Sequence, residues 1–354
     1  MTALIRQALA RLSEAMAVAI PPRILFRKPT VADLASKVAS MHETPSLQKE
    51  RGIIEERSKA RAHQPPGQEV YEFPLSFAQQ RLWFLDRFEG GGAAYHMARA
   101  VRLCGELNRD ALEQALREIV ARHESLRTHF AELNGQPVQV VVPALKIALP
   151  IEDLSALEDR ARETAIAAVL VRELEKPFKL SQGPLLRMTL VKLSEREHLL
   201  LRTFHHIVSD GWSVGVFNRE LSALYAAFCK GRRSPLESLP IQYPDYAVWQ
   251  RQFLQGAELD RQLGYWHAQL AAAPTLELAT DRPRPAKLTY AGARHAFTLS
   301  PSLSARIKDF NQRNNLTPFM SLLATFQVLL ARYSGQDDIL VGTPIANRQR
   351  SQLE

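Results

Sequence analysis

The sequence predicts an α/β fold, and three observations support this. Apolar residues recur at helical spacing over residues 108–122, whereas residues 136–142 and 185–193 are β-like runs. Hydrophobic residues make up 46% of the chain and charged residues 23%, which is typical of a globular protein with a sizeable core. At 354 residues the chain is long enough for two domains, or for one large domain with an appendage.

The N-terminal segment predicts two short helices. Over residues 1–18 apolar side chains recur at helical intervals, and Pro21-Pro22 ends this helix. A second helix is expected just after Pro29, where the side chain of Thr30 caps the following run. So few residues predict a partial helical bundle at most.

A linker is predicted between this helical segment and the rest of the chain. Residues 43–70 are polar and charged, and they include Pro65-Pro66-Gly67. We therefore expect a helical appendage over residues 1–42 and a large α/β domain over residues 71–354.

Composition excludes several classes of protein. Only two cysteines occur, Cys104 and Cys229, and their spacing favours neither a disulfide framework nor a metal site, so we expect no bound metal and a cytoplasmic location. No apolar stretch approaches the roughly 20 residues that span a bilayer. The net charge is +8, but part of the excess comes from the run 49–61 and no nucleic-acid-binding motif accompanies it. We expect neither a membrane nor a nucleic acid as partner.

A strand, a loop and a helix are predicted in the middle of the chain. Residues 198–208 are apolar and follow a charged turn, which indicates a buried strand. A loop over 209–212 is then expected to lead to a helix over 213–229, which carries one apolar face and has Ser213 as its predicted cap. Two adjacent histidines, His205 and His206, therefore lie where the strand ends.

The two histidines cannot share one role in this strand. Successive side chains of a strand face opposite ways, so one of His205 and His206 is structural and the other is available for chemistry. Histidine suits proton transfer near neutral pH. Asp210 either orients an imidazole or pairs with an arginine and braces the loop, and Gly211 permits a tight turn or the close approach of a substrate. An isolated HxxxD pattern is, however, just as typical of a buried structural pair.

Five motifs along the chain resemble those of one family. His205-His206-Ile207-Val208-Ser209-Asp210-Gly211 resembles the HHxxxDG motif of condensation domains from nonribosomal peptide synthetases. Four further stretches resemble motifs of that family and occur in the family's order: SFAQQRLWFL at 76–85, RHESLRTHF at 122–130, YPDYAVW at 243–249 and VGTPIANR at 341–348. From the residues alone, Trp83, Phe84 and Leu85 are expected in the core, and 243–249 is expected to pack between elements.

The resemblance implies a fold and a reaction. It implies two lobes that each resemble chloramphenicol acetyltransferase, the first complete in this chain and the second truncated, with a tunnel between them. The implied reaction joins a donor aminoacyl or peptidyl thioester to the α-amine of an acceptor aminoacyl thioester. Both substrates would be carried on the 4'-phosphopantetheine of partner carrier domains, and no cofactor would be bound by the condensation domain itself. The implied partners are upstream and downstream peptidyl carrier and adenylation domains of the same synthetase.

The resemblance also assigns roles to individual residues. His206 would lie at the reaction centre, as a general base or as a group that positions the amine, with His205, Asp210 and Gly211 completing the motif. Asp210 would form a structural ion pair with an arginine, and we favour Arg127 over Arg348 as its partner. Trp212 and Ser213 are candidates for the tunnel lining.

Both ends of the chain carry further expectations. Residues 1–42 resemble the C-terminal part of a peptidyl carrier domain, because the wording from Pro22 to Ala35 is typical of it, but the serine that would bear phosphopantetheine is absent. We also expect a chain cut at both ends and poorly active by itself. The wording around His206 resembles the subtype that joins an L-configured donor to an L-acceptor. Alternatives are a related epimerization or acyltransferase domain and an inactive recruitment fragment, although loss of His206 would mark the last.

Overall fold

A computed structural model describes residues 70–89, 91–283, 292–293 and 295–345, together with Arg348 and Leu353. The chain divides into two compact units, one of residues 54–259 and one that combines 1–53 with 260–354. The helices predicted within residues 1–42 and the linker predicted at 43–70 lie outside the described residues, except for Val70.

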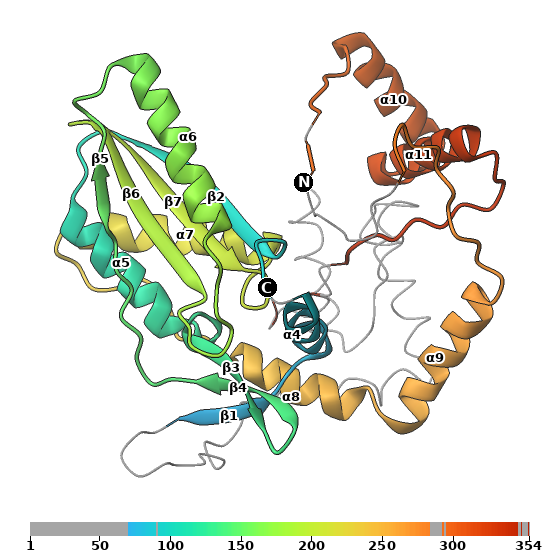
Figure 1. Cartoon of the computed structure of the whole chain (residues 1–354), viewed down its shortest axis with the longest axis horizontal. Helices are drawn as coiled ribbons and strands as arrows, with labels where there is room; N and C mark the ends of the chain where they lie inside the picture. The colour runs from blue at the N-terminus through green and yellow to red at the C-terminus, as the bar shows by residue number, and fades with distance from the viewer. Residues whose placement is uncertain are drawn as a thin grey trace, which may run out of the picture. The chain divides into compact units, whose positions relative to one another are not determined.

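The unit of residues 54–259 is built around a four-stranded sheet (Figure 1). Its strand order is β2-β7-β6-β5, with antiparallel pairing except between β5 and β6. Leu200 on β7 pairs with Val101 on β2 and with Leu190 on β6. The strands are β2 (His96–Cys104), β5 (Ile151–Asp153), β6 (Leu186–Ser194) and β7 (Glu197–His205).

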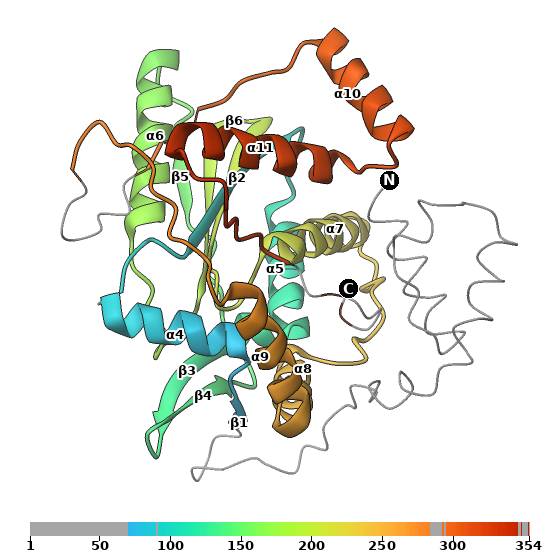
Figure 2. The ribbon, with the colours of Figure 1, turned by 90° about the vertical axis from the view of Figure 1, so that its right-hand side faces the viewer.

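Helices cover both faces of this sheet, as the edge-on view of Figure 2 shows. On one face α5 (Arg109–Arg122) and α7 (Gly211–Phe228) pack against the sheet, and the buried side chains there include Ile119, Leu200 and Leu224. On the other face α6 (Asp159–Glu175) buries Val169 against Val191 and Leu201. Alternate residues of β7 therefore enter two different cores, as the period of two in a strand requires.

A smaller three-stranded sheet lies in the same unit. Its order is β1-β4-β3, and both pairings are antiparallel. The strands are β1 (Tyr71–Pro74), β3 (Thr128–Leu133) and β4 (Gln136–Val141), and a short 3-10 helix η2 (Glu124–Arg127) precedes β3. Two helices flank them, α4 (Phe77–Glu89) and α8 (Tyr243–Phe253).

Residues 83–85 were predicted to lie in the core, and for Phe84 this prediction is wrong. On α4 the buried apolar residue is Leu82, and Trp83 packs against the same cluster. Phe84, however, is 59% exposed and stacks on Phe88, which lies one helical turn further along. Three consecutive helical positions span about 200° of the helix, so they cannot all face one core.

The described part of the second unit is helical. Helix α9 (Gly256–Leu270) contains the division between the two units, and α10 (Pro301–Arg313) and α11 (Pro318–Ser334) follow it. Ser300 caps α10, Thr317 caps α11 and Gly335 ends α11 in the left-handed conformation, with φ of 70°.

Most predicted elements within the described residues are confirmed. The helix predicted at 108–122 is α5, and the runs at 136–142 and 185–193 are β4 and β6 within about a residue. The strand predicted at 198–208 instead ends at His205, and residues 206–208 form a turn. Ile207 and Val208 are buried in that turn, so their apolar character reports burial and not strand geometry.

Cys104 and Cys229 are both exposed free thiols. Among the described residues no three or more His, Cys, Asp or Glu side chains cluster in a way that would hold a metal ion. None of the helices in the described part of the chain combines the length and apolarity of a membrane span.

Candidate active site

The turn after β7 presents one histidine and buries the other. His205 is 1% exposed, whereas His206 is exposed. One histidine is thus buried and the other exposed, as predicted, but His206 lies in the turn and not in the strand on which the prediction was based. Three hydrogen bonds fix the turn: the His206 amide donates to the Tyr95 carbonyl at 2.8 Å, the Val208 amide to the His205 carbonyl at 3.1 Å, and the Ile207 amide to Nδ1 of His205 at 3.1 Å.

His205 is held as a neutral imidazole. Burial lowers the pKa of His205 to about 4, and the neighbouring histidines His96 and His206 act in the same direction. Because Nδ1 accepts the Ile207 amide proton, the single proton of the neutral ring is on Nε2. His205 therefore supports the turn and is not placed to exchange protons near pH 7.

Asp210 begins the helix that follows. Its side chain accepts hydrogen bonds from the amide and the hydroxyl of Ser213, at 2.7 Å and 2.6 Å, and it is the N-cap of α7. The prediction that Ser213 caps a helix starting at 213 is wrong, because the helix starts two residues earlier and Ser213 is the residue that the cap binds. A carboxylate at this position also suits the positive end of the helix dipole.

Open space adjoins the start of α7. A Cβ atom added to Gly211 would meet no described atom within 4 Å, so the protein itself requires no glycine there through close packing. Trp212 and Ser213, the candidates for a tunnel lining, are half-buried at the first turn of the helix. The described residues thus leave room beside Gly211, and its role toward a substrate stays a prediction.

The two candidate arginines lie in different units. Arg127, at the end of η2, donates to the Val142 carbonyl and lies 3.4 Å from the carboxylate of Glu124. Arg348 donates to the Leu353 carbonyl at 2.5 Å. These contacts do not choose between them, and the pairing of Arg127 with Asp210 stays a prediction.

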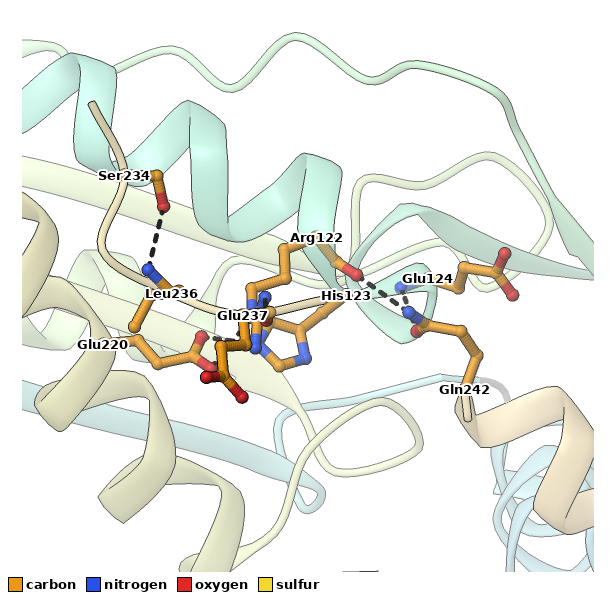
Figure 3. Close-up of polar contacts among 8 residues, drawn as sticks. All are labelled: Arg122, His123, Glu124, Glu220, Ser234, Leu236, Glu237 and Gln242. Atoms are coloured by element: carbon orange, nitrogen blue, oxygen red, sulfur yellow. Dashed lines mark hydrogen bonds and ion pairs between the residues drawn. The ribbon is translucent and has the colours of Figure 1, made fainter. Parts of the chain in front are cut away.

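A buried carboxylate ties the second motif to helix α7 (Figure 3). Glu220, 8% exposed, accepts hydrogen bonds from Nε of Arg122 at 3.0 Å and binds Nε2 of His123 at 2.6 Å. Burial alone would raise the pKa of Glu220, but the hydrogen bonds and charges of His123 and Arg122 outweigh it and lower that pKa. Gln242 completes the cluster by bridging the Arg122 carbonyl and the Glu124 amide, each at 3.0 Å. This part of the motif is structural.

The first and fourth motifs meet at α4 and α8. The hydroxyls of Ser76 and Tyr243 lie 2.9 Å apart, and the Phe77 amide donates to the side chain of Gln250 at 3.0 Å. Arg251 donates to the Leu75 carbonyl at 2.8 Å. The expectation that 243–249 packs between elements is therefore confirmed.

Three residues near these contacts, Glu220, Tyr95 and His96, were not predicted from the sequence. Glu220 is an acid on the apolar side of α7, between Phe217 and Leu224, which is a signal for a buried ion pair. Tyr95 and His96 carry no such local signal. His96 pairs with His205 between β2 and β7, and the Tyr95 carbonyl accepts from the His206 amide, so both contacts join segments that are distant in the sequence.

Comparison with known proteins identifies a family. Residues 69–354 match the family model of the condensation domain. The chain is 44% identical over 349 residues to a linear gramicidin synthase of Brevibacillus parabrevis, a match that covers 98% of the chain but only 4% of that relative. It is 41% identical over 331 residues to malpinin synthetase of Mortierella alpina, which covers 93% of the chain and again 4% of the relative. The chain thus spans a small part of the length of these curated relatives.

Solved structures show the same fold. The X-domain from teicoplanin biosynthesis superposes with a TM-score of 0.68 at 31% identity, covering 80% of this chain and 60% of that one. The first condensation domain of the CDA synthetase superposes with a TM-score of 0.62 at 24% identity, over 79% of this chain and 68% of that one, and supports the α/β fold alone. With the family model matching from residue 69 to the last residue, the chain belongs to the condensation domain family of nonribosomal peptide synthetases.

Proposed function

We propose that this chain catalyses amide bond formation between two carrier-bound thioesters in nonribosomal peptide synthesis. The observation that carries the proposal is the exposed His206 on a turn fixed by three hydrogen bonds, beside the open backbone of Gly211. This arrangement offers one imidazole to a substrate and fixes its backbone in advance. The membership of the family supports the same reaction.

In the proposed reaction the acceptor's α-amine attacks the carbonyl carbon of the donor thioester. A C–N bond forms, the C–S bond breaks, and the donor's phosphopantetheine thiol leaves with a proton while the amine loses one. His206 accepts the amine proton, or hydrogen-bonds the amine and steadies the developing charge. Because thioester aminolysis is downhill, holding the two tethered reactants in line supplies much of the rate enhancement.

Several finer features belong to the same proposal. Residues 1–42 would be the end of a peptidyl carrier domain and 43–70 its linker, and the domain would form lobes resembling chloramphenicol acetyltransferase. The donor and acceptor would both be L-configured, the carriers and adenylation domains would belong to the same cytoplasmic synthetase, and Arg127 would pair with Asp210. The wording of the motifs supports these assignments.

A condensation assay with two loaded carrier domains tests the function. The synthetase that contains this chain is incubated with an aminoacyl donor carrier and an aminoacyl acceptor carrier, and the carrier-bound product is hydrolysed and identified by mass spectrometry and chiral chromatography. His206→Ala is expected to lower the rate by about 100-fold while leaving residual product, because positioning remains. His295→Ala, at an exposed histidine in the other unit, is the matched control.

The outcomes separate the alternatives. A dipeptide with unchanged stereochemistry supports condensation. An epimerised donor without a new amide would support the epimerization alternative instead. No product from either reaction, or a His206→Ala rate equal to that of the wild type, would contradict the proposed role.

A second candidate is a recruitment module. A similar solved structure is described as a complex of the teicoplanin X-domain with OxyB, so that relative binds another protein. The exposed His206 in an intact motif favours catalysis over recruitment here. Binding without turnover in the assay above would reverse that preference.

A further inference from the structure

His96 is a half-buried histidine next to the site, outside every motif named above. It begins β2 and pairs directly with His205 on β7 in the antiparallel register. The two imidazole centroids are 6.1 Å apart at 72°, and the ring of Phe178 packs edge-on against both, at 4.9 Å and 6.2 Å. His96 and His205 thus share one corner of the fold, where the guanidinium of Arg187 lies 3.8 Å from the centre of the same Phe178 ring.

The hydrogen bonds determine which nitrogen of each ring carries the proton. Nδ1 of His96 lies 2.7 Å from the carbonyl oxygen of Leu174 at the end of α6, and because a carbonyl only accepts, that nitrogen is the protonated one. On His205 the reverse holds, because Nδ1 accepts from the Ile207 amide. Neutral His96 therefore has a lone pair on Nε2, and neutral His205 has its proton on Nε2.

The two remaining nitrogens are complementary. Nε2 of His96 and Nε2 of His205 are both buried and have no hydrogen-bond partner among the described residues. A ring nitrogen lies about 1.2 Å from its ring centre, so with centroids 6.1 Å apart the two atoms are at least about 3.7 Å apart, too far for a direct hydrogen bond. At a separation near this lower bound, a single water would span the gap and satisfy one donor and one acceptor.

We propose that His96 is a positioning residue: through one bridging water it holds the protonated Nε2 of His205, and so keeps the His205 ring oriented to support the turn that presents His206. The other tautomer of His205 would set its Nδ1 proton against the Ile207 amide proton and open the turn. Tyr95, directly before His96, holds the same turn through its carbonyl. The end of α6 and the start of β2 thereby influence the position of His206 without contacting the substrate.

The inference rests on the proposed function only for its effect on catalysis, so its test begins with a structural measurement. Nitrogen-15 NMR of the wild-type chain at pH 7 should show His96 protonated on Nδ1 and His205 on Nε2. Finding His205 protonated on Nδ1, or His96 on Nε2, would overturn the proposal whatever the activity.

Two variants then separate positioning from packing. His96→Phe keeps an aromatic ring against Phe178 but removes both nitrogens, whereas His96→Asn is smaller but keeps a donor and an acceptor. We expect hydrogen exchange of the Ile207 amide to accelerate about tenfold or more in His96→Phe and to stay near the wild type in His96→Asn. If His96 contributes only packing, the Ile207 amide should exchange at the wild-type rate in His96→Phe and faster in His96→Asn. That order is the opposite of the one expected here.

The condensation assay supplies the functional readout. His96→Phe should lower kcat by about 10- to 100-fold with little change in KM for the acceptor carrier, and His96→Asn should restore most of the rate. If His206→Ala is as active as the wild type, the proposed function of His206 fails, while the exchange of Ile207 still tests His96. If His206→Ala is inactive but His96→Phe changes neither exchange nor kcat, only the inference about His96 fails.

Discussion

The buried, neutral state of His205 predicts a pH dependence of stability. An unfolded histidine has a pKa of about 6.5, whereas burial lowers that of His205 to about 4 in the fold. Between these values the unfolded chain binds a proton that the folded chain does not, so stability falls as the pH falls through this window and levels off below it. Above about pH 6.5 the group contributes no pH dependence.

The magnitude follows from the two pKa values. Between pH 7 and pH 5 the wild type should lose about 2 kcal/mol of unfolding free energy through His205 alone. His205→Asn keeps an acceptor for the Ile207 amide but does not titrate in this range. The loss attributable to His205 is therefore the difference between the two proteins in the change of unfolding free energy between pH 7 and pH 5.

The assay needs a probe confined to the unit that contains His205. Of the four tryptophans, Trp83, Trp212 and Trp249 lie in the unit of residues 54–259 and only Trp266 lies in the other. In a Trp266→Phe background, urea unfolding followed by tryptophan fluorescence reports on that unit alone.

The comparison with His205→Asn can refute the assignment of His205 as a buried neutral imidazole. We expect the wild type to lose about 2 kcal/mol more than the variant between pH 7 and pH 5. His295→Asn, at an exposed histidine, should run parallel to the wild type. Parallel curves for His205→Asn as well would refute the assignment of a buried neutral imidazole.

Substitutions at three further positions, Asp210, Glu220 and Tyr243, test the scaffold by urea unfolding. Asp210→Ala should cost about 1 kcal/mol and Asp210→Asn much less, because Asn retains a capping oxygen; equal losses would mean that the charge of Asp210 outweighs its cap. Glu220→Ala should cost about 3 kcal/mol at pH 7, and less in acid, because a carboxylate with a lowered pKa stabilises above its unfolded pKa and loses this as the pH falls through the folded value. A loss that grew in acid would contradict this. Tyr243→Phe removes the contact with Ser76 and should cost about 1 kcal/mol, against almost nothing for Tyr265→Phe at a ring that is 61% exposed.

Local sequence patterns predicted the regular elements well. The apolar spacing of α5 leads to burial of Leu112, Ala115 and Ile119, because a helix of this period presents one face to the sheet. One of His205 and His206 is buried and the other exposed, as predicted, although His206 lies in the turn after β7 and not in the strand. The spacing of apolar residues that predicts such an element lies within a few consecutive residues.

The ends of elements were predicted less well, for a physical reason. Ile207 and Val208 are as buried in a turn as they would be in a strand, so hydrophobicity does not mark where β7 ends. Asp210 and Ser213 are both good N-caps, and a helix beginning at either residue keeps Phe217 and Leu224 buried. The hydrogen bonds of the capping carboxylate distinguish the two, and they appear only in the structure.

Contacts between distant segments were beyond reach of local patterns. His96 precedes His205 by more than a hundred residues, and nothing in its own sequence neighbourhood indicates a partner. Glu220 was more accessible, because an acid on the apolar face of a helix needs buried donors. Which donors it finds, Arg122 and His123, depends on how α5 and α7 pack.

Under the proposed function, the HHxxxDG motif divides into one reacting group, His206, and its supports. His205 holds the turn from the strand side, and Asp210 holds the helix that leaves it. Ile207 and Val208 anchor the turn in the core between them. Because the segment is fixed at both ends and in its middle, the imidazole of His206 is the group left to face a substrate. The precision of the site therefore comes from backbone and core contacts, and residues that never meet the substrate, such as His96, are expected to change the rate.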